Sequence, residues 1–547
     1  MRKLFYTTAC IWLICLSCGL SQNVEWVKLI TGSINNIDLG HIFISVNGAI
    51  LFSQAFTPDT LLTIDDQIIN PNNYGVTEFF VSNVKNNGTI GNIKIPQSRK
   101  KHTLNGLVVD GDMNSFIIGE YNNLAIFDSI ILDKSGQTKG FGMFLMKLDS
   151  SLKVKWAYPI SYYNNGSFGT AQGKAITIDE SSLYFAGLCS GGVIANNDTL
   201  NSTAFIIKSD LEGNNKWVKK IYGNLGSSQL FNYGMRLSND KKKGLLFASN
   251  ISYKGAIIID SVKLISKEND ILISLFDTLG NLVWTKILGG EKTEIMSDVK
   301  LINETVYVSG FTSGDMYMNG ERVFKNSSTF VIALNAGNGE KKWIKDYGKY
   351  CGYPNLAVSK NNLFVSVEFW DTVLSNRKYI PFKNEKDTYS ADILIEQINS
   401  SGDVLFSFKI GNKGSERFPI VGLDSLNHLY LICNFVGVPD ILGISFDAHY
   451  GSFLAKIKLP TLSVNLEDKN NLQVLESEEF VKIKMPAKPH KSLLSCFNSI
   501  GDKLFTKDIL PLTDFIELSK STFNNGKYFC TIEHDGITET ISFVINK

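Results

Sequence analysis

The sequence predicts an all-β protein, in which a seven-bladed β-propeller closed by an N-terminal strand is followed by a small immunoglobulin-like β-sandwich. The first observation is a repeat, because a tryptophan phrase returns at Trp156, Trp217, Trp284 and Trp343, at intervals of about sixty residues. The second is period-two alternation of apolar residues within the repeat, with Gly, Asn, Asp and Ser at the turns. The third is composition: 45 Gly and 35 Phe favour strands and turns over helices.

The first segment, residues 1–21, predicts a secretory signal peptide. Arg2 and Lys3 precede a short apolar run that ends in small residues, with cleavage expected near Gln22. A membrane anchor is the alternative, although the run is short for a bilayer span. A lipoprotein signal ending at Cys18 fits less well. No later segment reads as a transmembrane span.

Residues 22–461 are read as a β-propeller of about seven four-stranded units. In each unit, a short apolar strand is followed by a second strand, a variable loop, a third strand and the tryptophan phrase. A single sheet of this kind cannot bury both of its faces, so neighbouring units must cover one another. Units one and six carry Ile93 and Phe406 where the tryptophan is expected. The units begin near His41, Leu104, Gly173, Tyr233, Asp298, Asn355 and Pro419.

The phrase "VEWVKLITG", Val24 to Gly32, is a fourth strand with no first three strands before it. The seventh unit, in contrast, ends with its third strand, "SFLAKIKLP", and has no fourth. We therefore expect the N-terminal strand to pair beside "SFLAKIKLP" and to close the ring, which removes exposed sheet edges. Chance similarity of an aromatic strand is the alternative.

The turns before the tryptophans read "SDLEGNNKW" from Ser209 and "LNAGNGEKKW" from Leu334. These phrases are similar to the sialidase Asp box and the quinoprotein tryptophan-docking repeat, but Asp210 directly follows Ser209, and no axial cofactor-binding set can be assembled. We expect instead a glycine at positive φ and a tryptophan packed on the adjacent blade. The repeats resemble the SBBP-type and related propeller repeats of large exported bacterial proteins, over roughly residues 24–461. The resemblance implies a β-propeller fold and indicates almost nothing about function.

The repeat ends before residue 462, and residues 462–547 predict a small antiparallel sandwich. This segment also resembles the C-terminal sorting domain of the type IX secretion route, although "KMPAKPHKS" replaces the usual "P-N-P" at its start. The resemblance implies a Gram-negative bacterium, a secretion machinery as partner, and a protein that is released or held at the outer cell surface. The alternative is an ordinary immunoglobulin-like module. The matching positions are Phe497, Gly501, Lys503, Ile516, Leu518, Ser519, Gly526, Tyr528, Ile532, Gly536 and Lys547.

Five cysteines remain after signal removal, and no C-x-x-C spacing indicates a zinc site. Cys496 and Cys530 both lie in the last segment and could form a disulfide, or they could be two small apolar core residues. An odd number of cysteines leaves at least one thiol outside any intramolecular disulfide.

No catalytic, cofactor-binding or metal-binding residue is assigned from the sequence. The six histidines neither cluster nor recur with the repeat, and no metalloprotease, serine-hydrolase or phosphate-loop motif occurs. The acidic phrase "DGDMN" at Asp110 is read as a turn. A formal charge of +1 with interspersed signs argues against a nucleic-acid partner.

A short phrase of Asp, then Ser or Thr, then an apolar residue recurs before the third strands. It resembles the O-glycan acceptor of bacteria that use this secretion route. A turn residue followed by a strand start explains the phrase equally well. The candidate acceptors are Thr60, Ser129, Thr199, Ser261 and Thr372.

The loops that lead from one unit to the next are the expected ligand-binding face, and three of them are rich in aromatic residues. Tyrosine with asparagine and glycine suits a glycan or protein ligand, whereas rings that only cap the blade ends are the alternative. The sequence thus favours a secreted or cell-surface binding or adhesion protein without a cofactor, over a polysaccharide- or peptide-cleaving enzyme or a surface-layer spacer. The candidate ligand-binding residues are Tyr162, Tyr163, Phe168, Phe231, Tyr233, Tyr350 and Tyr353.

Overall fold

The structure is a computed structural model, and the chain divides into two compact units, residues 24–457 and a unit that contains residues 458–547. The signal-peptide prediction for residues 1–21 lies outside the described residues. Described are residues 23–545, except for 32–40, 45–49, 57–61, 66, 70–77, 96–101, 123, 134–140, 164–170, 190–191, 196–197, 201–203, 224–233, 253, 360–361, 376–377, 382–389, 412–413, 427, 443, 447–449, 460–462, 466–472, 477–478, 486–490, 499–501, 512, 514 and 535–536.

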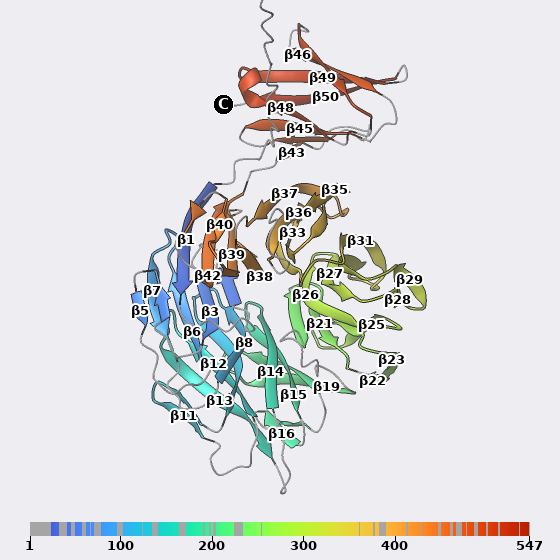
Figure 1. Ribbon diagram of the computed structural model, residues 1–547. Helices are drawn as coiled ribbons and strands as arrows, with labels where there is room; N and C mark the ends of the chain where they lie inside the picture. The colour runs from blue at the N-terminus through green and yellow to red at the C-terminus, as the bar shows by residue number, and fades with distance from the viewer. Residues whose placement is uncertain are drawn as a thin grey trace, which may run out of the picture. The chain divides into compact units, whose positions relative to one another are not determined.

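The all-β prediction is confirmed. Among the described residues, every regular element is a strand apart from one short 3-10 helix, η1 (Lys520–Thr522) (Figure 1). No described helix has the length and apolar character that a membrane span requires.

In residues 24–457, the described strands form seven sheets with a core of four antiparallel strands each. We number these sheets 1 to 7 in chain order of their first strand. Sheets 1 to 4 are, from first to fourth strand, β2 (His41–Ile44), β3 (Ile50–Phe56), β6 (Glu78–Val84) and β7 (Ile90–Lys94); β8 (His102–Val109), β9 (Ser115–Asn122), β12 (Phe141–Leu148) and β13 (Val154–Tyr163); β14 (Ala171–Ile178), β15 (Ser182–Cys189), β18 (Ala204–Asp210) and β19 (Asn215–Tyr222); and β20 (Met235–Asp240), β21 (Gly244–Asn250), β24 (Ile271–Phe276) and β25 (Leu282–Gly290).

Sheets 5 to 7 continue the same order of strands. In sheet 7, the strand after the third strand is the N-terminal β1, as the sequence predicts. These sheets are β26 (Glu294–Ile302), β27 (Thr305–Thr312), β30 (Ser328–Asn335) and β31 (Lys341–Gly348); β32 (Asn355–Ser359), β33 (Asn362–Phe369), β36 (Asp392–Ile398) and β37 (Val404–Ile410); and β38 (Ser415–Leu423), β39 (His428–Val436), β42 (Tyr450–Lys458) and β1 (Asn23–Thr31).

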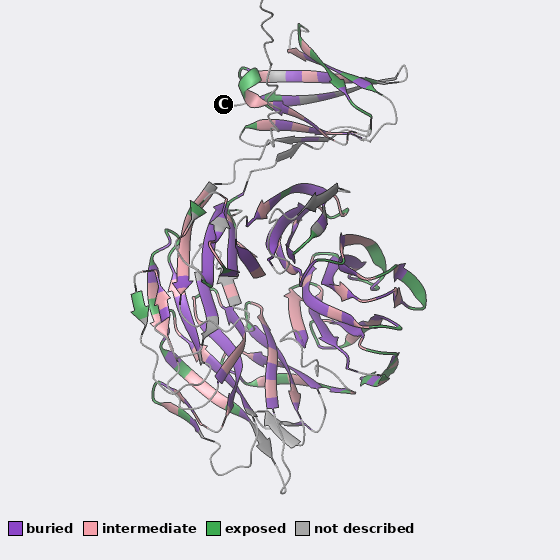
Figure 2. Cartoon of the chain, viewed as in Figure 1, coloured by how far each residue is buried: buried purple, intermediate pink, exposed green. Residues whose placement is uncertain are grey.

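Short hairpins occupy the connection between second and third strands, where the sequence predicts only a variable loop. Four of these hairpins pair with the fourth strand of the preceding sheet. Figure 2 shows exposed residues gathered on such outer strands. The four are β4 (Leu62–Ile64) and β5 (Gln67–Ile69) on β1, β16 (Gly192–Ala195) and β17 (Asp198–Leu200) on β13, β22 (Gly255–Ile259) and β23 (Val262–Ser266) on β19, and β28 (Met316–Met318) and β29 (Glu321–Phe324) on β25.

The other three hairpins are separate two-stranded sheets: β10 (Leu124–Phe127) with β11 (Ile130–Asp133), β34 (Thr372–Ser375) with β35 (Lys378–Pro381), and β40 (Asp440–Ile441) with β41 (Ile444–Ser445).

The recurring Asp-Ser phrase forms the tips of two of these hairpins. Asp128 and Asp260 have φ of 55° and 49°, and each is followed by an exposed serine and then by a strand. A lysine from the preceding sheet binds each aspartate: Lys94 binds Asp128, and Lys219 binds Asp260 at 3.0 Å. The turn interpretation of the phrase is therefore confirmed at these two positions.

The tryptophans of three internal phrases, Trp217, Trp284 and Trp343, each lie over a turn glycine of the next sheet, whereas Tyr158 of the Trp156 phrase has this place over Gly213. The indole of Trp343 lies over Gly402, a turn glycine with φ of 90°, and its Nε1 donates a hydrogen bond to the Ser400 carbonyl at 2.9 Å. Trp284 lies in the same way over Gly339. A side chain at either glycine would collide with the indole, so the turn requires glycine for its φ and for this contact. The packing expectation is confirmed.

Strand β1 makes the same contacts as an internal fourth strand. Trp26 lies over Gly88 of sheet 1 and donates to the Asn86 carbonyl at 3.0 Å. On its other side, Glu25 is paired with Lys456 of β42 at 2.7 Å. Ile30 is fully buried in a cluster that joins sheet 7 to sheet 1.

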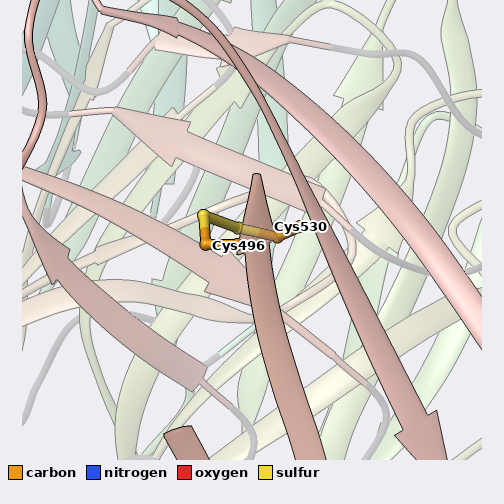
Figure 3. The surroundings of a disulfide bond; sticks show 2 residues. All are labelled: Cys496 and Cys530. Carbon is orange, nitrogen blue, oxygen red and sulfur yellow. A yellow bond between two sulfur atoms is a disulfide. The ribbon is translucent and has the colours of Figure 1, made fainter. Parts of the chain in front are cut away.

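The unit that contains residues 458–547 has two four-stranded antiparallel sheets with one shared apolar core. Cys496 and Cys530 lie opposite each other on paired strands β46 and β49 and form a disulfide (Figure 3). Cys189, Cys351 and Cys433 are buried thiols. The sheets are, in spatial order, β43 (Ser463–Asn465), β44 (Gln473–Glu476), β45 (Phe480–Lys484) and β48 (Phe515–Ser519); and β47 (Lys503–Ile509), β46 (Ser492–Asn498), β49 (Gly526–His534) and β50 (Ile537–Ile545).

Candidate functional site: an axial cavity

The first strands of the seven sheets lie next to one another. Contacts run from β2 to β8, β14, β20, β26, β32 and β38, and then from β38 back to β2. A cavity of about 370 Å³ lies among these strands, and each of them contributes to its lining. That volume falls in the range of small-molecule sites, about 300–1,000 Å³.

One wall of the cavity is basic. Lys174 of β14, Arg236 of β20 and Lys300 of β26 come from three consecutive first strands. Among the described residues, the lining contains no aspartate or glutamate. We call these three side chains the basic wall.

Lys174 is held in place by a buried carboxylate behind it. Its Nζ lies 2.8 Å from Glu120 Oε1, and the Asn105 amide donates to the same oxygen at 2.9 Å. The second oxygen of Glu120 accepts from Gln172 at 3.3 Å. Asn105 also donates to the Gly173 carbonyl at 2.6 Å, which fixes its amide group at the edge of the cavity. Glu120 is only 7% exposed, so its carboxylate interacts with these side chains and little with bulk water.

Lys300 is held in an equivalent way by Asp298, whose Oδ2 lies 2.7 Å from its Nζ. The same oxygen accepts from the Asn355 amide at 3.2 Å and from the backbone of Leu356 at 3.1 Å. Asn355 in turn accepts a hydrogen bond from the Val421 backbone at 2.9 Å. The Asn355 side chain thus connects three neighbouring first strands and has little freedom to move.

Ser297 adds a hydroxyl group to the cavity lining. Its side chain is 2% exposed, and its Oγ has no hydrogen-bond partner among the described residues. A buried hydroxyl normally has a partner, so this group is available to a molecule in the cavity.

The opposite wall is apolar and aromatic. It includes Tyr353, Pro354 and Leu356, together with Ile420 and Val421 of β38. Burial, and to a smaller extent the neighbouring Glu368, raises the pKa of the Tyr353 hydroxyl, which therefore stays protonated at neutral pH. Burial also raises the pKa of Glu368 itself, although the Phe418 backbone donates to its Oε2 at 2.8 Å.

The predicted aromatic ligand-binding residues lie at different places in the structure. Tyr353 lines the cavity, but Tyr350 does not; it is 38% exposed, with Lys349 Nζ 4.6 Å from its ring centre. Tyr162 and Tyr163 end strand β13, where their backbone pairs with β16. The remaining three, Phe168, Phe231 and Tyr233, lie outside the described residues.

The basic wall was not predicted from the sequence. A signal was present, because three consecutive predicted first strands, "GKAITID", "MRLSND" and "SDVKLIN", each carry one cation. A single cation in a short strand is usually solvated, so the recurrence alone did not indicate a site.

The sorting-motif positions lie in the unit that contains residues 458–547. Phe497 is in β46, and Gly526 begins β49. Tyr528 is buried, and its hydroxyl donates to the Asn524 carbonyl at 3.0 Å. Gly501 and Gly536 are outside the described residues. No group of three or more potential metal ligands occurs in the described part of the chain.

No family model matches the chain, and no curated protein matches it either. Among solved structures, it is similar to a protein of unknown function from Dyadobacter fermentans, with 9% identity, coverage of 79% of this chain and 98% of that chain, and a TM-score of 0.36. It is also similar to quinohemoprotein alcohol dehydrogenase from Comamonas testosteroni, with 10% identity, 82% and 79% coverage, and a TM-score of 0.37. At these scores the similarities carry no argument about function.

Proposed function

We propose that this protein is a secreted or cell-surface binding protein, built as a closed seven-bladed β-propeller whose axial cavity holds the ligand. The single observation that carries the binding function is the cavity lining, which combines a tyrosine, asparagines, a serine and three cations. Such a mixture of apolar area and fixed polar groups is typical of small-molecule sites.

The cyclic contacts of the first strands support the closed ring, as do the contacts of β1 with both of its neighbours. Trp26 docks on Gly88 just as Trp343 docks on Gly402, although the other core strands of the sheet that contains Trp26, β38, β39 and β42, lie about 390 or more residues later in the sequence. A propeller of this kind would hold seven sets of strand ends around one axis.

The alternative of an axial hydrolase has less support. Two carboxyl groups with separated pKa values are the usual requirement for hydrolysis of a glycosidic bond. The described lining instead presents cations and amides, with Glu120 and Asp298 each bound to a lysine. Hydrolysis of a tested polymer by the purified protein would contradict the proposal.

A glycan array and a peptide pull-down with the full chain would test the binding function. We expect a bound ligand whose affinity falls at least about tenfold in Tyr353→Ala, because this ring lines the cavity. Tyr450→Ala is the matched control, since Tyr450 is 57% exposed and lies outside the lining. An equal loss of ligand affinity in both variants would mean that the ligand does not bind in the cavity.

The proposed export route rests on the resemblance of residues 462–547 to type IX sorting domains, and on the N-terminal signal. Expression in a bacterium with this route should place the full chain at the cell surface or in the medium. A chain that ends before residue 462 should stay in the periplasm. Equal export of both chains would contradict a sorting role for this segment.

A further inference from the structure

We infer that the axial cavity holds a ring with several hydroxyl groups, a neutral sugar, and that the Ser297 hydroxyl pairs with one of these groups. This inference rests on the proposed binding function and specifies its ligand class and one residue that selects the ligand. It is carried by β-bulges in the first strands and by the hydrogen-bonding groups that the bulge residues bring to the cavity.

Four of the seven first strands have, in their described part, one residue more than the partner strand beside them. Asn105 of β8, Lys174 of β14 and Ser297 of β26 each lie between two residues that pair with successive residues of the second strand. In β38, the extra residue is within Phe418–Pro419. All of these bulge residues line the cavity. Since a bulge redirects a side chain and is frequent next to active sites, this coincidence indicates a site that the fold has shaped.

The bulge of β38 also holds an aromatic residue in an uncommon backbone conformation. Phe418 has φ of 54°, which a bulky side chain rarely adopts. Its backbone N–H donates to Glu368 Oε2 at 2.8 Å, which helps to hold this conformation. Backbone strain of this kind is concentrated at ligand sites, where the surrounding structure maintains it. Phe418 and Tyr353 thus bring two aromatic residues to the lining, which suit the apolar C–H face of a sugar ring.

The polar groups of the lining match hydroxyl groups, which both donate and accept hydrogen bonds. Ser297 is 2% exposed, and its Oγ has no partner in the described part of the chain, although a buried hydroxyl normally has one. The amide nitrogen of Asn105 donates to Glu120 and to the Gly173 carbonyl, which leaves its Oδ1 as an acceptor. A ligand hydroxyl can donate to Asn105 Oδ1, and another can pair with Ser297 in either direction.

The two lysines of the basic wall add hydrogen-bond donors whose charge is already balanced. Lys174 is paired with Glu120 at 2.8 Å, and Lys300 is paired with Asp298 at 2.7 Å. Because an ammonium group has three N–H donors, each lysine keeps donors beyond its ion pair. Such a donor suits the oxygen of a hydroxyl group and requires no acid group on the ligand. The lining therefore fits an uncharged ring that carries several hydroxyl groups.

Calorimetric titration of the full chain with glucose, galactose, mannose, maltose and cyclohexanol tests the ligand class. Cyclohexanol keeps a six-membered ring but has a single hydroxyl group. At least one of the four sugars should bind about tenfold or more tightly than cyclohexanol, because it satisfies several polar groups of the lining at once. The affinity for this sugar should change little as salt is raised, because the ligand carries no charge.

Substitution of Ser297 provides the second arm of the test. Ser297→Ala should weaken the tightest sugar about five- to tenfold, because one hydroxyl group of the ligand loses its partner, and Ser297→Thr should restore part of the loss. Ser115→Ala is the matched control and should leave the affinity unchanged. Ser115 is 1% exposed, its Oγ also lacks a partner among the described residues, and it lies outside the lining. Thermal unfolding of each variant verifies that it is folded.

The outcomes separate this inference from the proposed function. If no sugar of the panel binds more tightly than cyclohexanol at millimolar concentration, while array ligands bind and depend on Tyr353, the ligand class is wrong and a binding protein remains. If Ser297→Ala binds the sugar as tightly as Ser115→Ala does, the role of Ser297 is wrong. Absence of any ligand that depends on Tyr353 contradicts the binding function itself.

Discussion

At the residue scale, Glu294 is a fully buried carboxyl group placed beside a second acid, Asp270. Its Oε1 accepts from the Thr312 hydroxyl at 2.8 Å. Burial is the main reason why the pKa of Glu294 is raised, to about 8, and the neighbouring Asp270 adds to the effect. At neutral pH the group is therefore protonated.

A second pair of acids, Asp392 and Glu416, lies at the corresponding place two sheets later along the chain. The backbone of Glu416 donates to the Ala391 carbonyl at 2.7 Å, as that of Glu294 donates to the Asn269 carbonyl at 2.7 Å. Here Lys409 binds Asp392 directly. The Asp392 carboxylate is therefore paired with a lysine ammonium group.

The raised pKa of Glu294 predicts a pH-dependent stability. The unfolded chain releases the proton near pH 4.5, whereas the folded protein keeps it up to about pH 8, so the free energy of unfolding should fall as pH rises through this window. Glu294→Gln should make the stability less dependent on pH between these limits, as measured by urea unfolding. A wild-type stability that rises across this window relative to the variant would contradict the assignment.

The tryptophan contact predicts a position-specific effect of glycine substitution. At Gly402, with φ of 90°, a new Cβ would lie 2.9 Å from Trp343 Cδ2; at Gly320, with φ of 83°, nothing lies within 4 Å. Gly402→Ala and Gly320→Ala should share a backbone penalty of about 1–2 kcal/mol. Only Gly402→Ala should lose about 1–3 kcal/mol more, because the indole must move. Equal unfolding free energies of the two variants would show that the contact is unimportant.

The site shows what residue patterns can and cannot predict. Tyr353 was predicted because its loop is rich in aromatic residues, and it does line the cavity. The basic wall depends on which side chains of neighbouring first strands meet. No local pattern encodes that meeting, since it depends on contacts between separate sheets and on the register of each first strand.

At the element scale, the strand order of each sheet follows the predicted repeat, but the outer hairpins do not appear in the prediction. Their strands are short, as in β4 (Leu62–Ile64), so alternation has too few residues to be visible. Their partners also lie in the preceding sheet. The sequence nevertheless marks two of the tips, because Asp128 and Asp260 begin the recurring Asp-Ser phrase, for which a turn is one of the two interpretations.

The position of β1 predicts that its buried residues stabilise the protein as internal ones do. Ile30 of β1 and Ile273 of β24 are both fully buried. Ile30→Ala and Ile273→Ala should each lower the free energy of unfolding by about 2–5 kcal/mol. Denaturant unfolding of both variants measures this. An N-terminal strand that is only loosely attached would give an effect of a few tenths of a kcal/mol at Ile30.

At the scale of the whole molecule, the two compact units have separate apolar cores, and the disulfide belongs to the smaller unit. Replacement of both cysteines, Cys496→Ala with Cys530→Ala, releases a constraint across a sequence separation of 34 residues. The stability of this unit should fall by about 2–4 kcal/mol.

Calorimetry of the full chain can resolve this effect. The transition of residues 458–547 should move to lower temperature, and that of residues 24–457 should stay in place. A shift of both transitions by the same amount would mean that the units unfold together.

The central claim is that the N-terminal strand completes the last sheet and closes the ring, and zero-length carbodiimide cross-linking tests it most directly. Glu25 and Lys456 lie 2.7 Å apart, and the exposed pair Lys267 and Glu291, at 2.8 Å within one region of the chain, is the positive control. Mass spectrometry of the monomeric product should find peptides joined between residues 25 and 456, and the link should disappear in Glu25→Gln. A product in which the control pair is linked and residues 25 and 456 are not would contradict the closure.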